Sequence, residues 1–126
     1  MKNYKNILVK SHYVGIKTIV INDSKTYNSL STKTLKELLD VFKKLDKEKN
    51  TKVIIIEGSG KGFSAGHNLK EIKSLKKKIE YQKLFNLCSK LMLQIVEGRK
   101  PVIAKVHGAA FAAGCQLVAS CDLTYS

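Results

Sequence analysis

The chain has 126 residues, is 44% hydrophobic and carries a formal net charge of +13. This length fits one globular domain, and the composition is that of a folded protein rather than a disordered one. Its unbroken apolar runs, such as Val53–Ile56, are far shorter than the roughly 20 residues of a membrane span, so we expect no membrane partner. Residues 1–6 carry charge and lack the apolar segment of a secretory signal, which predicts a cytoplasmic location.

The positive charge raises a nucleic-acid hypothesis, which the residue types argue against. Of the 23 basic residues, all but Arg99 are lysines, whereas base readout and bidentate phosphate contacts favour arginine. The lysines are also spread along the whole chain instead of lying among exposed aromatic side chains. We therefore expect no nucleic-acid partner, although the lysines would attract an anionic ligand.

The cysteines are Cys88, Cys115 and Cys121. Their odd number and irregular spacing suit neither a disulfide framework nor a metal site. We predict three buried thiols and no bound metal.

The first half of the chain predicts the order strand, strand, helix, strand. Residues 5–11 and 16–21 are expected to form a hairpin, the second strand being a β-branched run. Ser31 is the predicted N-cap of a helix that extends to about Lys47, because leucines recur there at helical spacing. The short apolar run Val53 to Glu57 predicts a strand that is buried on both faces.

The second half continues the alternation of helices and strands. A loop of small residues at 58–66 leads into a polar stretch with one short predicted helix, and then Ile79 to Glu97 keeps a helical period, with Gly98 as the expected C′ residue. The remaining predictions are a strand over Val102 to Val106, a helix from about Ala113 to Cys121 and a strand from Asp122 to Tyr125. This order predicts a single α/β domain.

Two small-residue segments, Phe63 to Leu69 and Gly108 to Leu117, each follow a predicted strand. The second begins a helix, whose first N–H groups have no intrahelical acceptor and lie at the positive end of the helix dipole. Two such donors that converge would stabilise a developing oxyanion. Junctions of this kind more commonly serve tight packing, so the pattern alone leaves both interpretations open.

Four ordered segments resemble the enoyl-CoA hydratase/isomerase (crotonase) family across nearly the whole chain. They are Tyr27–Leu30, Phe63–Leu69, Lys100–Ala104 and Cys115–Leu123. The overlapping runs Gly66–Glu71 and Gly114–Asp122 also resemble one subgroup within the family. The resemblance implies a crotonase-type spiral of ββα units. Since members of the family are about twice as long, it implies that the chain is the N-terminal part of this domain, with the C-terminal half absent.

The resemblance also implies which residues bind the substrate. The oxyanion donors would be the backbone N–H groups of His67 and Ala113, and coenzyme A would contact His67, Asn68, Leu69 and Lys70. The His67 side chain is then tolerated rather than a general base, and His12 and His107 are structural. No cofactor is implied apart from the coenzyme A that is part of the substrate.

The departures from the family bear on activity. Hydratases of the family use two glutamates as base and acid; Gln116 stands at the position of the first, and the second would lie beyond residue 126. An amide orients water but does not exchange a proton near neutral pH. We therefore expect an acyl-CoA or enoyl-CoA binding protein of fatty-acid metabolism that is impaired in catalysis. The alternative is a non-enzymatic half-domain that assembles as a homo-oligomer or with a complementing C-terminal half.

Overall fold

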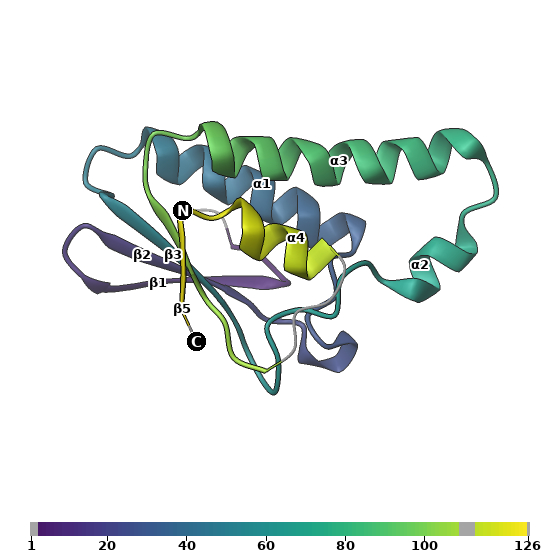
Figure 1. The fold of residues 1–126 in the computed structure, drawn as a ribbon, viewed down its shortest axis with the longest axis horizontal. Helices are drawn as coiled ribbons and strands as arrows, with labels where there is room; N and C mark the ends of the chain where they lie inside the picture. Colours follow the sequence, from purple (N-terminus) through teal and green to yellow (C-terminus); the bar gives the residue numbers. More distant parts are fainter. Residues whose placement is uncertain (1–2, 109–112, 126) are drawn as a thin grey trace.

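A computed structural model describes residues 3–108 and 113–125 of the chain. They form one five-stranded sheet with the strand order β1-β2-β3-β4-β5, in which β1 and β2 are antiparallel and all later neighbours are parallel. Four α-helices and one 3-10 helix connect the strands (Figure 1). The elements are β1 (Ile7–Tyr13), β2 (Ile16–Ile21), the 3-10 helix η1 (Ser24–Thr26), α1 (Thr32–Lys47), β3 (Val53–Gly58), α2 (Leu69–Ser74), α3 (Lys78–Glu97), β4 (Val102–Lys105), α4 (Ala113–Ser120) and β5 (Leu123–Tyr125).

The sequential strand order places the helices on one face of the sheet. Each parallel crossover moves to the next strand in the same direction, and crossovers of this kind are right-handed, so the connecting helices lie on the same side. Figure 1 shows α1 and α3 side by side above the sheet. Helix α4 contacts α3. The core between the two layers buries alternate strand residues, such as Ile54 and Ile56 of β3, against the apolar faces of the helices.

The predicted first helix is confirmed, including its N-terminal residue. The Ser31 side chain accepts a hydrogen bond from the backbone N–H of Thr34 at 3.2 Å, which is a standard N-cap. The buried face of α1 repeats every three or four residues, as the sequence indicates. Its buried hydrophobic members are Leu35, Leu38, Val41, Phe42 and Leu45.

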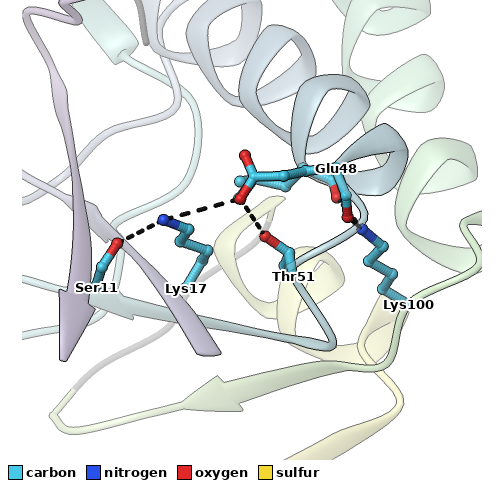
Figure 2. Close-up of polar contacts among 6 residues, drawn as sticks. Ser11, Lys17, Glu48, Thr51 and Lys100 are labelled. Carbon is cyan, nitrogen blue, oxygen red and sulfur yellow. Dashed lines mark hydrogen bonds and ion pairs between the residues drawn. The ribbon is translucent and has the colours of Figure 1, made fainter. Parts of the chain in front are cut away.

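A polar cluster joins the C-terminal end of α1 to the sheet (Figure 2). The ammonium group of Lys100 donates hydrogen bonds to the backbone oxygens of Leu45, at 2.6 Å, and of Glu48. The Glu48 carboxylate accepts a bond from the Thr51 hydroxyl at 2.8 Å and lies 3.8 Å from the Lys17 ammonium. A lysine therefore satisfies carbonyl groups at the negative end of α1, where cations are favourable.

Two local predictions are wrong. Strand β3 is not buried on both faces, because Val53 and Ile55 are only half-buried while the helices cover the other face. Gly98 is not a left-handed C′ residue: it is the C-cap of α3, with a φ of −62°. Glycine fits there for a steric reason, since a Cβ atom would lie 2.9 Å from the Gln94 carbonyl oxygen.

The other boundaries agree with the sequence to within about two residues, which is the usual spread at element ends. The short helix expected before residue 78 is α2, and the turn of 3-10 helix at Ser24–Thr26 was not expected. Across residues 3–108 and 113–125, no helix is both long and apolar enough to span a membrane.

Candidate functional site

The loops that carry the predicted site residues lie together at one edge of the sheet. They follow the carboxyl ends of the parallel strands β2, β3 and β4 and comprise residues 22–31, 59–68 and 106–108. The imidazole of His107 lies 2.7 Å from the Gly60 carbonyl oxygen and joins two of them. In open α/β sheets this edge is where ligands bind.

Asn28 holds two of these loops in place, a role that its sequence neighbours do not reveal. Its side chain is buried, accepts a hydrogen bond from the Asp23 N–H at 2.8 Å, and donates to the carbonyl oxygens of Ser59 at 2.7 Å and Gly62 at 3.1 Å. Its φ is 55°, in the left-handed region that asparagine tolerates better than most residues. The three bonds fix the 59–62 turn against the 23–28 loop.

The segment from Ser64 to His67 uses most of its own backbone donors. The Ala65 N–H is bonded to the Tyr27 carbonyl oxygen at 2.9 Å, and the Gly66 N–H to the Ser64 hydroxyl at 3.1 Å. The next N–H, that of His67, has no acceptor among the residues that the structure describes. The predicted oxyanion donor is therefore an N–H group without an acceptor among the described residues, and it follows two residues whose N–H groups are bonded.

The second predicted donor belongs to a helix that begins beside this segment. Helix α4 starts at Ala113, so the Ala113 N–H is among the first four of the helix, which have no intrahelical acceptor. The backbone at Gly114 is so close to Ser64 that a Cβ atom there would lie 2.8 Å from the Ser64 carbonyl oxygen. The structure thus brings the start of α4 next to the segment that leads to His67.

The His67 side chain packs against α3. Its ring makes an edge-to-face contact with Phe85, with ring centroids 5.4 Å apart and an interplanar angle of 89°. The Nδ1 atom is buried and has no hydrogen-bond partner among the described residues. The imidazole is therefore fixed by packing, in keeping with a side chain that is not placed to exchange a proton with a neighbour.

A cavity of about 280 Å³ opens on the predicted coenzyme A contacts. His67, Asn68 and Lys70 line it on one side, and Lys25 and Tyr27 line it on the other. A second cavity, of about 410 Å³, shares Lys25 and Tyr27 and adds Lys61. Lys25 and Lys61 could not be identified as site residues from the sequence, because each cavity is formed by two loops whose residues are about 30 to 45 positions apart and only the fold brings those loops together.

Asn68 also has a structural role. Its side-chain oxygen accepts the Glu71 N–H at 3.1 Å as the N-cap of α2, and its amide donates to the Ser29 hydroxyl at 3.3 Å. The Glu71 carboxylate in turn accepts the N–H and the hydroxyl of Thr32, at 2.9 and 2.8 Å, which fixes α2 on the start of α1.

Other predicted residues are only partly described. The backbones of Leu69 and Gln116 belong to α2 and α4, but their side chains lie outside the described residues, as do those of His12, Cys115 and Ala113. Among the described residues no group of three metal-binding side chains is present.

Cys88 is buried, as predicted, and burial raises the pKa of its thiol. Cys121 is only half-buried, and burial together with the nearby Asp122 raises the pKa of its thiol to about 12.

The fold and the candidate site define an α/β domain in which backbone groups and lysines gather at the carboxyl edge of the parallel strands. A model of the family described as enoyl-CoA hydratase/isomerase matches residues 11–126, and the chain belongs to this family. Enoyl-CoA hydratase domain-containing protein 3, mitochondrial, of Xenopus laevis is 43% identical over 118 residues, which are 93% of this chain and 39% of the relative. The subgroup that the sequence runs resemble is the one to which this relative belongs, enoyl-CoA hydratase domain-containing protein 3.

Solved structures of the family share the fold. An enoyl-CoA hydratase from Mycobacterium smegmatis superposes with a TM-score of 0.92 at 40% sequence identity, covering 95% of this chain and 47% of that one. The human enoyl-CoA hydratase domain-containing protein 3 superposes with a TM-score of 0.90, also at 40% identity and with the same coverage. The predicted fold class, the N-terminal part of a crotonase-type domain, is confirmed. The chain spans less than half the length of these relatives.

The predicted cytoplasmic location is wrong by the same comparison. The relatives from Xenopus laevis, human, rat and mouse are all named as mitochondrial proteins. The prediction considered only secretory signals, which need an apolar segment, whereas mitochondrial targeting segments are amphipathic and lack one. The absence of a secretory signal therefore does not distinguish the cytoplasm from the mitochondrion.

Proposed function

We propose that this chain binds a coenzyme A thioester and polarises its carbonyl group with the backbone N–H groups of His67 and Ala113. The observation that carries the proposal is the donor pattern of residues 65–67, in which the N–H groups of Ala65 and Gly66 are bonded internally and that of His67 is open. The start of α4 beside Ser64 supports the second donor, because the first N–H groups of a helix have no intrahelical acceptor. Two fixed donors stabilise the oxyanion of an enolate more than they stabilise a ground-state carbonyl.

Lysines at the cavity edges support the choice of coenzyme A. Lys25 and Lys70 line the cavity beside His67, and Lys61 lines the adjoining one. Ammonium groups make charge-assisted bonds to phosphate oxygens, and coenzyme A carries three phosphate groups. The proposal places the thioester at His67 and the nucleotide end toward these lysines, with no cofactor beyond the substrate itself. Relatives named as enoyl-CoA hydratases make a role in fatty-acid metabolism the natural one.

Catalysis is proposed to be weak in the direction of hydration. Adding water across a double bond requires one group to accept a proton and another to donate one. Gln116 occupies the position of the first family glutamate, and its amide cannot exchange protons near neutral pH. The proposed activity is therefore thioester binding and enolate stabilisation rather than efficient hydration, and Gln116→Glu is the substitution that would supply a carboxylate.

Calorimetric titration with butyryl-CoA tests the proposal. Ala113→Pro deletes one donor at the first position of a helix, where proline is well tolerated. We expect saturable binding that the substitution weakens about three- to tenfold, the value of one net hydrogen bond. Lys78→Pro is the matched control, because Lys78 is the first residue of α3 and Lys77 before it is already extended. No binding by the unmodified chain, or equal losses in both variants, would contradict the proposal.

The second candidate, a non-enzymatic half-domain that assembles with another chain or with itself, rests on strand β5. It lies at an edge of the sheet, pairs only with β4 among the described residues, and leaves 64% of Leu123 exposed. Such edges readily pair with another strand. Light scattering of the purified chain separates the candidates: a stable monomer that binds butyryl-CoA favours the first, and a dimer dispersed by Leu123→Lys favours the second.

A further inference from the structure

The hydroxyl group of Ser64 connects two of the loops at the carboxyl edge of the sheet. The side chain is buried, with 1% of its surface exposed. It donates a hydrogen bond to the Asn28 carbonyl oxygen at 2.7 Å and accepts one from the Gly66 N–H at 3.1 Å. One buried hydroxyl therefore joins the 22–31 loop to the 59–68 loop and uses both its proton and a lone pair to do so.

The backbone of Gly66 sets the direction of the His67 N–H. Its φ is 86°, in the region that glycine adopts readily, and it has no Cβ atom to restrict rotation about its backbone bonds. The Gly66 carbonyl group and the His67 N–H belong to one planar trans peptide unit, in which they point in opposite directions. A rotation at Gly66 would therefore turn the proposed oxyanion donor.

Hydrogen bonds hold this glycine on both of its sides. The Leu30 N–H donates to the Gly66 carbonyl oxygen at 2.6 Å, so the His67 N–H points away from Leu30. The Gly66 N–H is held by the Ser64 hydroxyl. Leu30 acts on the peptide unit after Gly66 and Ser64 on the unit before it, and together the two bonds restrict both backbone angles of the glycine.

The same serine borders the start of α4. A Cβ atom at Gly114 would lie 2.8 Å from the Ser64 carbonyl oxygen, 2.9 Å from the Ser64 Cβ atom and 3.1 Å from its Oγ atom. The second residue of α4 therefore lies close to both the backbone and the side chain of Ser64. Because the Ala113 N–H is the second proposed donor, a shift of Ser64 would change the position of one donor relative to the other.

We infer that Ser64 is a positioning residue for the carbonyl site, an inference that rests on the proposed function. Its hydroxyl acts through the backbone and not on the thioester itself: it fixes Gly66 and thereby the direction of the His67 N–H. Without the hydroxyl, the Gly66 N–H and the Asn28 carbonyl group both lose a buried partner, and the peptide unit before Gly66 turns toward a new one. The consequence is a weaker bond to the carbonyl oxygen, with the contacts to the coenzyme unchanged.

Calorimetry with butyryl-CoA and the thioether S-butyl-CoA, which lacks the carbonyl oxygen, tests this inference. The ratio of the two affinities reports the carbonyl contact alone. Ser64→Ala in the whole 126-residue chain should lower this ratio about three- to tenfold, the value of one net hydrogen bond. The affinity for S-butyl-CoA should stay within about twofold, because the coenzyme contacts do not involve Ser64. Ser64→Cys keeps a weaker donor and acceptor in the same place, so it should give an intermediate ratio and replaces the alanine variant if that variant does not fold.

Thr51→Val is the matched control. Thr51 is also buried, and its hydroxyl donates to the Glu48 carboxylate at 2.8 Å, before the start of β3, whereas Ser64 follows the end of that strand (Figure 2). Valine deletes this buried hydroxyl, so the variant should lose stability but keep the affinity ratio within about twofold. Amide hydrogen exchange gives a readout without ligand: Ser64→Ala should speed exchange of the Gly66 N–H about tenfold or more, and Thr51→Val should not.

Three results would overturn the inference. The first is an affinity ratio that Ser64→Ala leaves intact, and the second is an equal fall in Thr51→Val, which would trace the effect to stability. The third is unchanged exchange of the Gly66 N–H in Ser64→Ala. Equal affinity of the unmodified chain for the two ligands would contradict the proposed function and the inference together, whereas a preference that survives in Ser64→Ala overturns the inference alone.

Discussion

Replacing Asn28 tests how the loops of the site are held. Its side chain makes three hydrogen bonds of 2.7 to 3.1 Å from a buried position, and each is worth about 1 kcal/mol of net stability. Alanine deletes all three and adds about 1 kcal/mol because its φ would remain near 55°. We therefore expect Asn28→Ala to lower the free energy of unfolding by about 4 kcal/mol, a large part of the 5–15 kcal/mol typical of a domain.

Urea unfolding followed by circular dichroism measures this loss, and two further variants make it specific. Asn28→Gly removes the same bonds but tolerates a positive φ, so it should cost about 1 kcal/mol less than alanine. Asn50→Ala, at an exposed asparagine with no side-chain bond among the described residues, should change stability by less than about 0.5 kcal/mol. A loss below about 1 kcal/mol for Asn28→Ala would refute the view that this side chain organises the loops.

Three more predictions follow from single contacts. Lys100→Met should lower the free energy of unfolding, measured with urea, by about 1–3 kcal/mol, because two carbonyl groups at the end of α1 lose a charged donor. An unchanged free energy of unfolding would show that water replaces the ammonium group. Gly114→Ala should weaken butyryl-CoA binding with little change in helix content, because the new Cβ atom would push α4 away from Ser64. Unchanged affinity would count against the proposal that the N–H groups of His67 and Ala113 bind the same carbonyl oxygen. The folded pKa of Cys121 is about 12, above its unfolded value near 9. This thiol should therefore resist alkylation at pH 8, and the fold should lose stability as the pH rises from about 9 to 12. Rapid alkylation of Cys121 at pH 8, measured by mass spectrometry, would contradict the raised pKa on which both expectations depend.

The elements with strong local patterns could be predicted from the sequence. Helix α1 has a serine cap followed by a regular leucine stripe, and α3 keeps its period for 20 residues, so both were found with their bounds nearly right. The β-branched runs similarly indicated β2 and β3. One-sided burial of β3 was missed, because an apolar run has the same sequence whether helices cover one face of the sheet or both.

The candidate site likewise has one part that local sequence predicts and another part that depends on the fold. The segment around His67 and the start of α4 could be found from their small residues and from the family resemblance, and the structure places them together. The roles of Asn28, Lys25 and Lys61 could not, because each depends on a loop folded against residues about 30 to 40 positions away. Two signals could have pointed to Asn28: an asparagine in a polar loop, where this residue tolerates a left-handed backbone, and its place in the family-like segment Tyr27–Leu30.

The most direct test of the proposed function compares two ligands that differ only in the carbonyl group next to the sulfur atom. S-butyl-CoA, a thioether, has the coenzyme and the alkyl chain of butyryl-CoA but no carbonyl oxygen to accept the two backbone bonds. By calorimetry we predict that the unmodified chain binds butyryl-CoA about ten- to thirtyfold more tightly than the thioether, the value of two net hydrogen bonds, and that Ala113→Pro removes much of this preference. Equal affinity for the thioester and the thioether would contradict the account, since it would show that the N–H groups of His67 and Ala113 do not bind the carbonyl oxygen.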